Sequence, residues 1–319
     1  MFLPELKSLP NEDICLLIKL DNHTPYYICE CGDAGLLSIK DCQNSQVIFI
    51  SHLHIDHFVN FDTILRHQIG MEKKVVVCGP EGIARQVQSK IGAYTWNLIE
   101  AGSIIYEIRE IINEQEIHIY EIEPPKWELR KTSIIRENIV FGNERFQVNF
   151  TLLDHKVPSV AYLFQEADTV KIDLSKSDFR GGAWVRELKT AFEQQIPDNE
   201  IIIADKSYTA KDLFHLLNIK KGDTLGVIMD HAPNADNHAK IKALFSGCDK
   251  VFIESFYKLE DKTFAEANHH SYSEASGRIM RECGVKEAVP VHFSRKYDED
   301  DVQQLIKEFR QAYTNYIVQ

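Results

Sequence analysis

Ser51-His52-Leu53-His54-Ile55-Asp56-His57 is the stretch that decides the fold of this chain of 319 residues. It directly follows an apolar run at 46–50 and precedes a segment, 58–65, whose apolar positions suit a helix. The stretch therefore lies where a buried strand ends. It holds three imidazoles and one carboxylate within six residues, and these groups are the usual ligands of zinc and similar ions. We interpret it as part of a metal site.

The spacing within this stretch predicts which side chains act together. Side chains of an extended segment alternate with period two, so we expect His52 and His54 to point the same way. Asp56 and His57 come where the chain turns into the helix, and they can face a second ion nearby. The alternative is a polar loop with unrelated histidines.

Four other side chains that can act as metal ligands also lie at or just past the ends of predicted strands. Each comes directly after an apolar run, and the four are His155, Asp230, Glu254 and His292. Ligand sites of mixed α/β proteins gather at such strand ends. The pattern predicts that these distant segments meet at one site.

The remaining pattern predicts a single domain over residues 1–319, because no stretch rich in Pro, Gly or Ser divides the chain. Strands at 14–20 and 25–29 flank good turn residues and predict a hairpin. Residues 165–223 are more polar, and we predict that they form a substrate-facing insertion. Helices are expected at 271–283 and 300–313.

Composition limits the classes of function. The chain is 44% hydrophobic and has no apolar run near the roughly twenty residues that span a bilayer, so we expect no membrane partner. Its seven dispersed cysteines and the lack of an export-signal pattern favour a cytoplasmic protein. A net charge of −12 argues against a general polyanion binder, although a local patch around bound cations could still hold nucleic acid.

The motifs together resemble a known family. His52-x-His54-x-Asp56-His57, followed by His155, Asp230 and His292, is similar to the metallo-β-lactamase superfamily. The resemblance implies an α/β fold, an αββα sandwich of two mixed sheets flanked by helices. Finer motifs resemble the ribonuclease Z branch, which processes transfer RNA 3′ ends; they are Leu153-Asp154-His155-Lys156-Val157-Pro158-Ser159, Asn268-His269-His270-Ser271 and Val291-His292-Phe293-Ser294-Arg295-Lys296-Tyr297.

The resemblance also implies a ligand set for two divalent ions, zinc first, with manganese or iron as alternatives. One ion would take His52, His54 and His155, and the other would take Asp56, His57 and His292. Asp230 would be shared between them. Such a pair can hold a bridging hydroxide and clamp the oxygens of a phosphodiester, and Asp56 could also orient or deprotonate the attacking water.

A further group of residues receives catalytic roles from the resemblance. His270 would face the scissile phosphate and protonate the leaving 3′-oxygen, and Glu254 would hold His270. A helix-capping or surface histidine is the alternative for His270. Ser294 and Lys296 would bind phosphate oxygens of the substrate.

The chain departs from the branch outside the ligand set. Residues 1–20 lack its Gly-Thr-Gly turn and its Pro-Thr-x-x-Arg-Asn loop. Only Gly181-Gly182 corresponds to its glycine- and proline-rich arm. Its His-Glu-Ala-Thr motif is Ile253-Glu254-Ser255-Phe256 here, and its closing arginine is Lys296.

The first hypothesis is a two-metal phosphodiesterase, ribonuclease Z-like, that acts on RNA at transfer RNA 3′ ends. The alternative is a phosphodiesterase of small diesters such as cyclic nucleotides, which the missing arm and the acidic charge favour. Hydrolysis of a thioester or β-lactam is a weaker alternative, because it gives a phosphate-facing His270 no purpose. A non-catalytic scaffold is weaker too, because the set of seven metal ligands is intact. By analogy with relatives of the branch, we expect a homodimer.

Overall fold

The computed structural model describes residues 1–10 and 12–314. The chain divides into two compact units, one made of residues 1–165 together with those from 224 onward, and the other of Glu166–Asp223. Residue 11 and residues 315–319, which the predicted domain over 1–319 includes, lie outside the described residues. The substrate-facing role of the segment at 165–223 remains a prediction.

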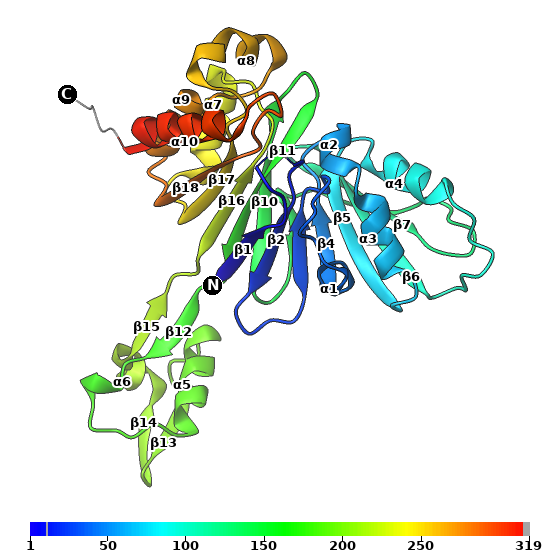
Figure 1. The fold of residues 1–319 in the computed structure, drawn as a ribbon. Helices are drawn as coiled ribbons and strands as arrows, with labels where there is room; N and C mark the ends of the chain where they lie inside the picture. The colour runs from blue at the N-terminus through cyan, green and yellow to red at the C-terminus, as the bar shows by residue number, and fades with distance from the viewer. Residues whose placement is uncertain (11, 315–319) are drawn as a thin grey trace. The chain divides into compact units, whose positions relative to one another are not determined.

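The first sheet of the larger unit has eight strands in chain order (Figure 1). Its strands are β1 (Phe2–Leu6), β2 (Leu16–Leu20), β3 (Tyr26–Cys29), β4 (Ser45–Phe49), β5 (Lys73–Pro80), β6 (Ile104–Asn113), β7 (Glu116–Ile122) and β8 (Arg130–Ile135). Strands β3 to β6 pair in parallel, and β2 pairs antiparallel with β3. The predicted hairpin is thus confirmed.

The second sheet has six strands in the order β18-β17-β16-β11-β10-β9. They are β9 (Ile139–Gly142), β10 (Phe146–Asp154), β11 (Pro158–Glu166), β16 (Thr224–Ile228), β17 (Lys250–Glu254) and β18 (Glu287–Val291). Because β16, β17 and β18 run in parallel, their carboxyl ends meet at one edge of the sheet. Asp230, Glu254 and His292 stand at that edge.

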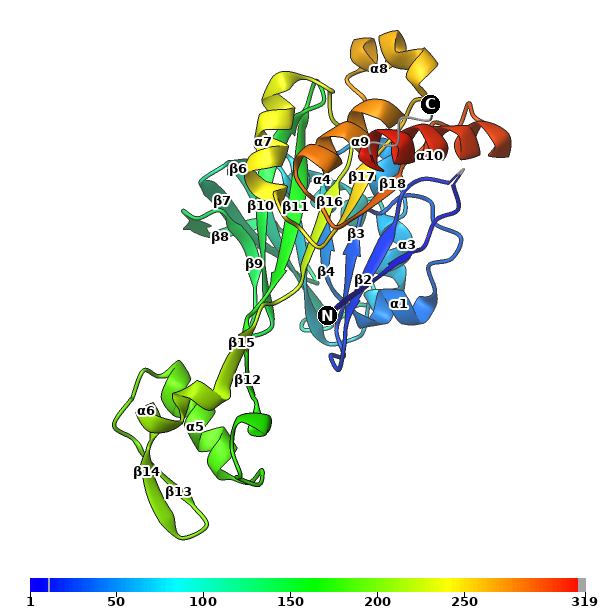
Figure 2. The ribbon, with the colours of Figure 1, turned by 90° about the vertical axis from the view of Figure 1, so that its left-hand side faces the viewer.

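The two sheets face one another, and helices cover their outer faces (Figures 1 and 2). The core between the sheets is aromatic: the ring of Phe49 on β4 lies 5.2 Å from that of Tyr162 and 5.0 Å from that of Phe164, both on β11. The helices over the first sheet are α1 (Ile39–Asn44), α2 (Ile55–Phe58), α3 (Phe61–Gln68) and α4 (Ile83–Gly92). Those of the second half are α7 (Ala235–Phe245), α8 (Lys262–Asn268), α9 (Ser273–Glu282) and α10 (Glu299–Thr314). The predicted αββα sandwich is confirmed.

Two local features differ from the sequence-based expectation. The helical pattern over 58–65 is broken, since α2 ends at Phe58 and α3 begins at Phe61. The backbone N–H of Asn60 donates to the carbonyl of Cys31, 2.8 Å away, and this bond ties the break to the segment after β3. Strand β6, which alternates buried and half-buried residues, was not predicted.

The smaller unit has a core of its own. Its elements are β12 (Thr169–Ile172), η1 (Leu174–Lys176), α5 (Trp184–Glu193), β13 (Glu200–Ile203), β14 (Lys206–Thr209), α6 (Ala210–Leu213), η2 (Phe214–Leu216) and β15 (Leu217–Lys220). Trp184, Leu188, Ile201 and Leu213 are buried together between them. In the larger unit a further short helix, η3 (Leu259–Asp261), precedes α8.

Within the part of the chain that the structure describes, no helix combines the length and the apolar character needed to cross a bilayer.

The contact between α9 and α10 leads to a first prediction. A Cβ atom on Gly277 would lie 2.4 Å from the backbone oxygen of Phe309 and 2.9 Å from Cβ of Ala312. We therefore expect Gly277→Ala to lower the free energy of unfolding by about 1–3 kcal/mol, because the helices must separate. Gly92→Ala, the control in α4, meets nothing within 4 Å and should be neutral or stabilise by up to about 1 kcal/mol. Urea unfolding followed by circular dichroism measures both; equal effects would contradict this packing.

The seven cysteines lead to a second prediction, since all are free and buried. Burial raises the thiol pKa, to about 11 for Cys42 and Cys283 and to about 12 for Cys78. Above about pH 8.5 the unfolded chain therefore loses thiol protons that the native state keeps, so the stability falls as pH rises. Burial lowers the pKa of Lys73 to about 8, which makes the stability rise with pH. This is a single group, however, against seven thiols that make the stability fall.

The measurement is the urea midpoint at pH 7.5 and pH 9.5 under reducing conditions. We expect a lower midpoint at pH 9.5, and a smaller drop in Cys78→Ala, which has one titrating thiol fewer. A midpoint that did not change with pH would contradict the prediction.

Candidate metal centre and active site

Asp230 stands at the centre of the site, just after β16, and is 1% exposed. Its two carboxylate oxygens face different histidines. Oδ2 lies 3.8 Å from Nε2 of His52 and 3.5 Å from Nε2 of His155. Oδ1 lies 3.4 Å from Nε2 of His57 and 3.5 Å from Nε2 of His292. The carboxylate therefore lies between two groups of imidazoles.

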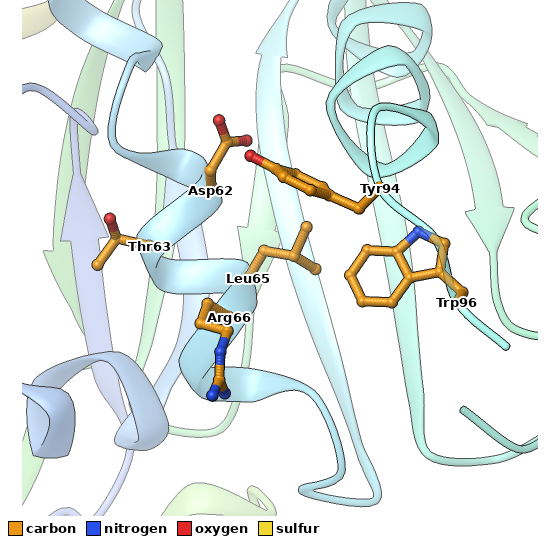
Figure 3. Close-up of a pocket in the computed structure, with 6 residues that line it drawn as sticks. All are labelled: Asp62, Thr63, Leu65, Arg66, Tyr94 and Trp96. Carbon is orange, nitrogen blue, oxygen red and sulfur yellow. The ribbon is translucent and has the colours of Figure 1, made fainter. Parts of the chain in front are cut away.

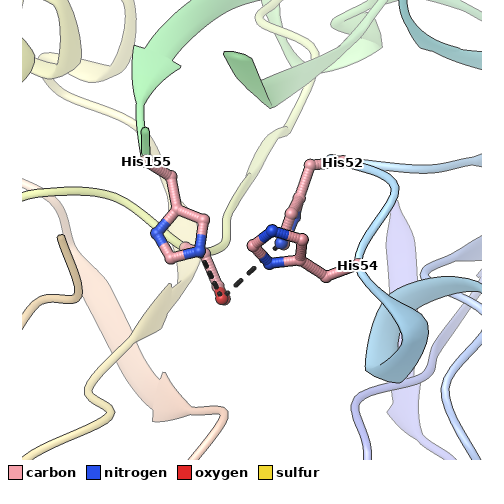
Figure 4. A group of neighbouring side chains, drawn as sticks. His52, His54 and His155 are labelled. Atoms are coloured by element: carbon pink, nitrogen blue, oxygen red, sulfur yellow. Dashed lines mark ion pairs between the residues drawn. The ribbon is translucent and has the colours of Figure 1, made fainter. Parts of the chain in front are cut away.

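The first group consists of His52, His54, His155 and Asp230, whose candidate ligand atoms all lie within 4.8 Å of one another. The rings of His52 and His54 are 4.4 Å apart, as alternation in an extended segment requires. Figure 4 shows the three imidazoles converging on one carboxylate oxygen, with His155 arriving from the end of β10 and the other two from the loop after β4.

The second group consists of Asp56, His57 and His292, again within 4.8 Å. Asp56 Oδ2 is 3.6 Å from Nε2 of His292 and 3.7 Å from Nε2 of His57. The two Nε2 atoms themselves are only 2.9 Å apart. The structure thus brings all seven residues of the expected ligand set into two adjoining clusters that could hold metal ions.

Hydrogen bonds on the far side of the rings aim them at this centre. Nδ1 of His57 donates to Oε2 of Glu30 over 2.9 Å, and Nδ1 of His155 donates to the carbonyl of His269 over 2.6 Å. Because carboxylate and carbonyl oxygens only accept, each of these rings must carry its proton on Nδ1. Nε2 of each ring is therefore the atom that faces Asp230, the arrangement typical of metal-bound histidines.

Glu30 is a site residue that the sequence analysis missed. It is fully buried at the end of β3, and besides His57 it accepts the backbone N–H of Ser51 over 2.9 Å. Its φ of 68° lies in the left-handed region, which is uncommon for a residue other than glycine. A carboxylate directly after a predicted strand was the available signal, the same one that identified Asp230 and Glu254.

Two observations test whether divalent cations fit here. Nε2 of His52 and Oδ1 of Asp230 are buried and have no hydrogen-bond partner among the described residues. An unpaired buried polar atom costs about 1–3 kcal/mol; Nε2 of His52 belongs to the first group, and Oδ1 of Asp230 faces the second. Imidazole nitrogens and carboxylate oxygens suit zinc, manganese and iron, so the residues fit such ions.

Charge and burial prepare these groups as ligands. Burial, reinforced by the neighbouring His57, lowers the pKa of His52 to about 2, which keeps this imidazole neutral. Burial alone would raise the pKa of Asp230, but His292 and His57 hold it well below its usual range. Burial would lower the pKa of His57, but the carboxylates of Asp230 and Glu30 raise it well above its usual value. The centre therefore combines a neutral His52 with an ionised Asp230 that His57 balances in charge.

His270 and Glu254 form a third cluster with Asp230. Glu254 ends β17 and is fully buried; its Oε1 accepts from Nδ1 of His270, and its Oε2 accepts the backbone N–H groups of His231 and Ser271 at 3.1 and 3.0 Å. Burial would lower the pKa of His270, but the carboxylates of Glu254 and Asp230 raise it above its usual value. Glu254 thus engages Nδ1 of His270, while Nε2 of the same ring has no partner among the described residues.

The two expected phosphate-binding residues line the same depression, but their surroundings differ. Ser294 is 8% exposed and lines a depression beside Asp56 and His292. The Nζ of Lys296, in the same depression, lies 2.8 Å from Asp261 and within 5.5 Å of three aromatic rings, those of Tyr257, Phe264 and Tyr297. The ammonium group of Lys296 already has an acidic partner.

Two depressions adjoin the cluster. The one with Ser294 has a volume of about 410 Å³, and the other, beside His54, His155 and His270, about 470 Å³. Such volumes are typical of ligand sites. Figure 3 shows a further depression of about 410 Å³ elsewhere, lined by Asp62, Thr63, Leu65, Arg66, Tyr94 and Trp96. It contains one carboxylate, which pairs with Lys90 at 3.2 Å, so we place the candidate chemistry at the cluster.

The chain is similar to known proteins over nearly its whole length. No protein-family model matches the chain. It is 25% identical over 315 residues to the ribonuclease Z of Deinococcus radiodurans, which covers 93% of this chain and 92% of that relative. The resemblance to the ribonuclease Z-like branch of the metallo-β-lactamase superfamily is therefore confirmed.

Solved structures share the fold. The short form of human tRNase Z has a TM-score of 0.56 and 14% identity, with 93% of this chain and 94% of that one covered. Yeast PDE1 has a TM-score of 0.57 and 10% identity, with 99% and 95% covered. The backbone alone therefore does not distinguish among these proteins.

The position of Glu30 leads to a third prediction. We expect Glu30→Gln to weaken zinc binding about 10- to 100-fold, because an amide has one acceptor oxygen for the two donors, Nδ1 of His57 and the N–H of Ser51, that Glu30 now accepts. Glu110→Gln is the matched control: Glu110 is also buried and accepts a backbone N–H, that of Gly82 at 2.9 Å, outside the cluster. Competition against a chromogenic chelator measures the affinity. Equal affinities of the two variants would refute the role of Glu30.

Proposed function

We propose that this chain is a two-metal phosphodiesterase of the ribonuclease Z type that hydrolyses RNA at the 3′ ends of transfer RNA precursors. The observation that carries the proposal is the carboxylate of Asp230, with one oxygen toward each histidine group and the His270–Glu254 pair beside it. Similarity to a ribonuclease Z over nearly the whole of both chains supports a hydrolase of phosphodiester bonds.

The residues present would hold two divalent ions, one at His52, His54 and His155 and the other at Asp56, His57 and His292. Asp230 would bridge them. When bound, such ions supply an activated water and stabilise the negative charge that develops on the phosphate oxygens. We propose zinc as the resident metal, with manganese or iron as alternatives.

We infer that Asp56 acts on the attacking water. Its side chain is about one-third exposed, and it lines the depression that contains Ser294. Burial would raise the pKa of Asp56, but His292 and His57 hold it well below its usual range. The ionised carboxylate can therefore accept a hydrogen bond from the attacking water and orient the lone pair of the water oxygen. Ser294 Oγ is the candidate donor to a phosphate oxygen.

We infer that His270 assists the leaving group. Glu254 accepts from Nδ1, so the second proton of the imidazolium sits on Nε2. As the bond between phosphorus and the 3′-oxygen breaks, the electron pair remains on that oxygen, and His270 gives it a proton. Glu254 stabilises the imidazolium before the transfer and fixes its direction.

A phosphodiesterase of small diesters is the alternative. One observation favours it: Lys296, the expected phosphate ligand, is engaged by Asp261 and three rings. A precursor transfer RNA, a 2′,3′-cyclic nucleotide, bis-p-nitrophenyl phosphate and a thioester distinguish the candidate functions. We expect efficient cleavage of the precursor RNA at its 3′ end. Efficient turnover of only the cyclic nucleotide would support the alternative, and turnover of only the thioester would refute both.

We further propose that the protein acts in the cytoplasm as a homodimer. The support is the set of free, buried thiols and the analogy with ribonuclease Z-like relatives. Light scattering coupled to size-exclusion chromatography determines the oligomeric state.

The role of His270 leads to a fourth prediction. His270→Ala should lower kcat on RNA by about 10²- to 10⁴-fold, the usual contribution of a general acid, while the metal content measured by mass spectrometry stays unchanged. His118→Ala is the matched control, because His118 also pairs with a glutamate, Glu116 at 2.7 Å, but on β7 outside the cluster. Normal RNA turnover by His270→Ala would show that the assigned role is wrong.

A further inference from the structure

The residue after the Glu254-Ser255 pair is an aromatic one, Phe256, and its ring stacks on His270. The two ring centroids are 4.0 Å apart and the planes differ by 11°. On its other side His270 meets the ring of His155 nearly edge-on, at 4.6 Å and 67°. The imidazole is thus enclosed between an aromatic face and an aromatic edge.

This stack supplies a constraint that Glu254 does not. A hydrogen bond at Nδ1 fixes one atom of the imidazole, but the ring can still rock about that bond. A parallel ring in van der Waals contact fixes the plane. Together the two contacts determine where Nε2, the atom that would deliver the proton, points.

Phe256 is itself held firmly. The backbone N–H of Ser255 donates to the carbonyl of Val291 over 2.9 Å, and the carbonyl of Phe256 accepts the N–H of Ser294 over 3.0 Å. Both bonds connect the segment after β17 to the segment that carries His292. The phenyl ring also contacts His292, at 5.1 Å between centroids, so it touches both halves of the cluster.

The ring also lies where the substrate must pass. Phe256 lines the depression of about 410 Å³ beside Asp56 and the depression of about 470 Å³ beside His155. Tyr257 packs against it edge-on at 4.9 Å but lines only the second depression. A residue common to both depressions is next to the reacting phosphate whichever side the leaving group takes.

We propose that Phe256 is a positioning residue of the reaction, which holds the imidazole of His270 in the plane needed to protonate the leaving oxygen. This inference rests on the proposed function, because it concerns a phosphodiester whose leaving group needs a proton. Phe256 itself transfers no proton and binds no ion. Its effect is therefore confined to substrates with poor leaving groups.

That restriction defines the experiment. A p-nitrophenolate leaves without a proton, whereas a phenolate of higher pKa depends increasingly on the general acid. The holoenzyme and Phe256→Leu are compared on a series of diaryl phosphates whose leaving groups run from p-nitrophenol to p-chlorophenol to phenol. We expect kcat of Phe256→Leu to fall less than about 3-fold for p-nitrophenyl and about 10- to 100-fold for phenyl. The dependence of rate on leaving-group pKa is thus steeper.

Three further variants make the test specific. Phe256→Tyr keeps the stacked ring and should restore the shallow dependence. Phe252→Leu is the matched control, since Phe252 lies on β17 just before the segment of Phe256, is 4% exposed and does not stack on His270; it should shift all rates in parallel. Combining Phe256→Leu with His270→Ala should lower the phenyl rate no further than His270→Ala alone, because both remove one function.

The outcomes are distinct. A parallel decline of all rates in Phe256→Leu, or an additive loss in the double variant, would overturn the positioning role and leave the proposed function standing. Failure to process precursor RNA, with the leaving-group dependence still steeper in Phe256→Leu, would refute the RNA substrate and support the role of Phe256. Absence of hydrolysis of every diester by the unaltered holoenzyme would overturn both.

Discussion

The buried carboxylate of Asp230 is the constraint on which this structure depends. At 1% exposure it has lost nearly all contact with water, and an ionised group in that position needs compensating charge. The four Nε2 atoms around it belong to segments separated by up to 240 positions in the sequence. The parallel ends of β16, β17 and β18 and the loop after β4 must therefore meet at one place, and the αββα sandwich is what brings them there.

Hydrogen bonds within the chain fix the direction in which the histidine side chains point. Glu30 holds His57, the carbonyl of His269 holds His155, and Glu254 holds His270. Backbone conformation contributes as well. Four residues beside the centre other than glycine have φ in the left-handed region; they are Glu30 (68°), Lys156 (60°), His269 (58°) and His292 (57°). Each costs on the order of 1–3 kcal/mol, and such strain gathers where function determines the geometry.

Much of this could be predicted from local patterns. An apolar run followed at once by a histidine or carboxylate identified the segments of His155, Asp230, Glu254 and His292, because strand and ligand are neighbours in the sequence. Tertiary contacts were not accessible in the same way. The pairing of Lys296 with Asp261 joins residues 35 positions apart, and the stack of Phe256 on His270 joins residues 14 positions apart.

Other features were missed for specific reasons. Glu30 stands between two cysteines and matches no motif that the sequence analysis used, although it follows a strand as Asp230 does. The core of the smaller unit, built from Trp184, Leu188, Ile201 and Leu213, comes from apolar residues dispersed through a polar segment. Left-handed φ values at residues other than glycine leave no trace in composition or periodicity.

The hydrogen bonds behind the imidazoles have a consequence for how the protein acquires its ions. Because Glu30 and the carbonyl of His269 already fix the rings of His57 and His155, these two ligands need little rearrangement to bind an ion. A receptor shaped in advance from nitrogen and oxygen donors admits any divalent ion of suitable radius, in the order of intrinsic affinity. The identity of the bound ion then depends on which ions the surroundings supply.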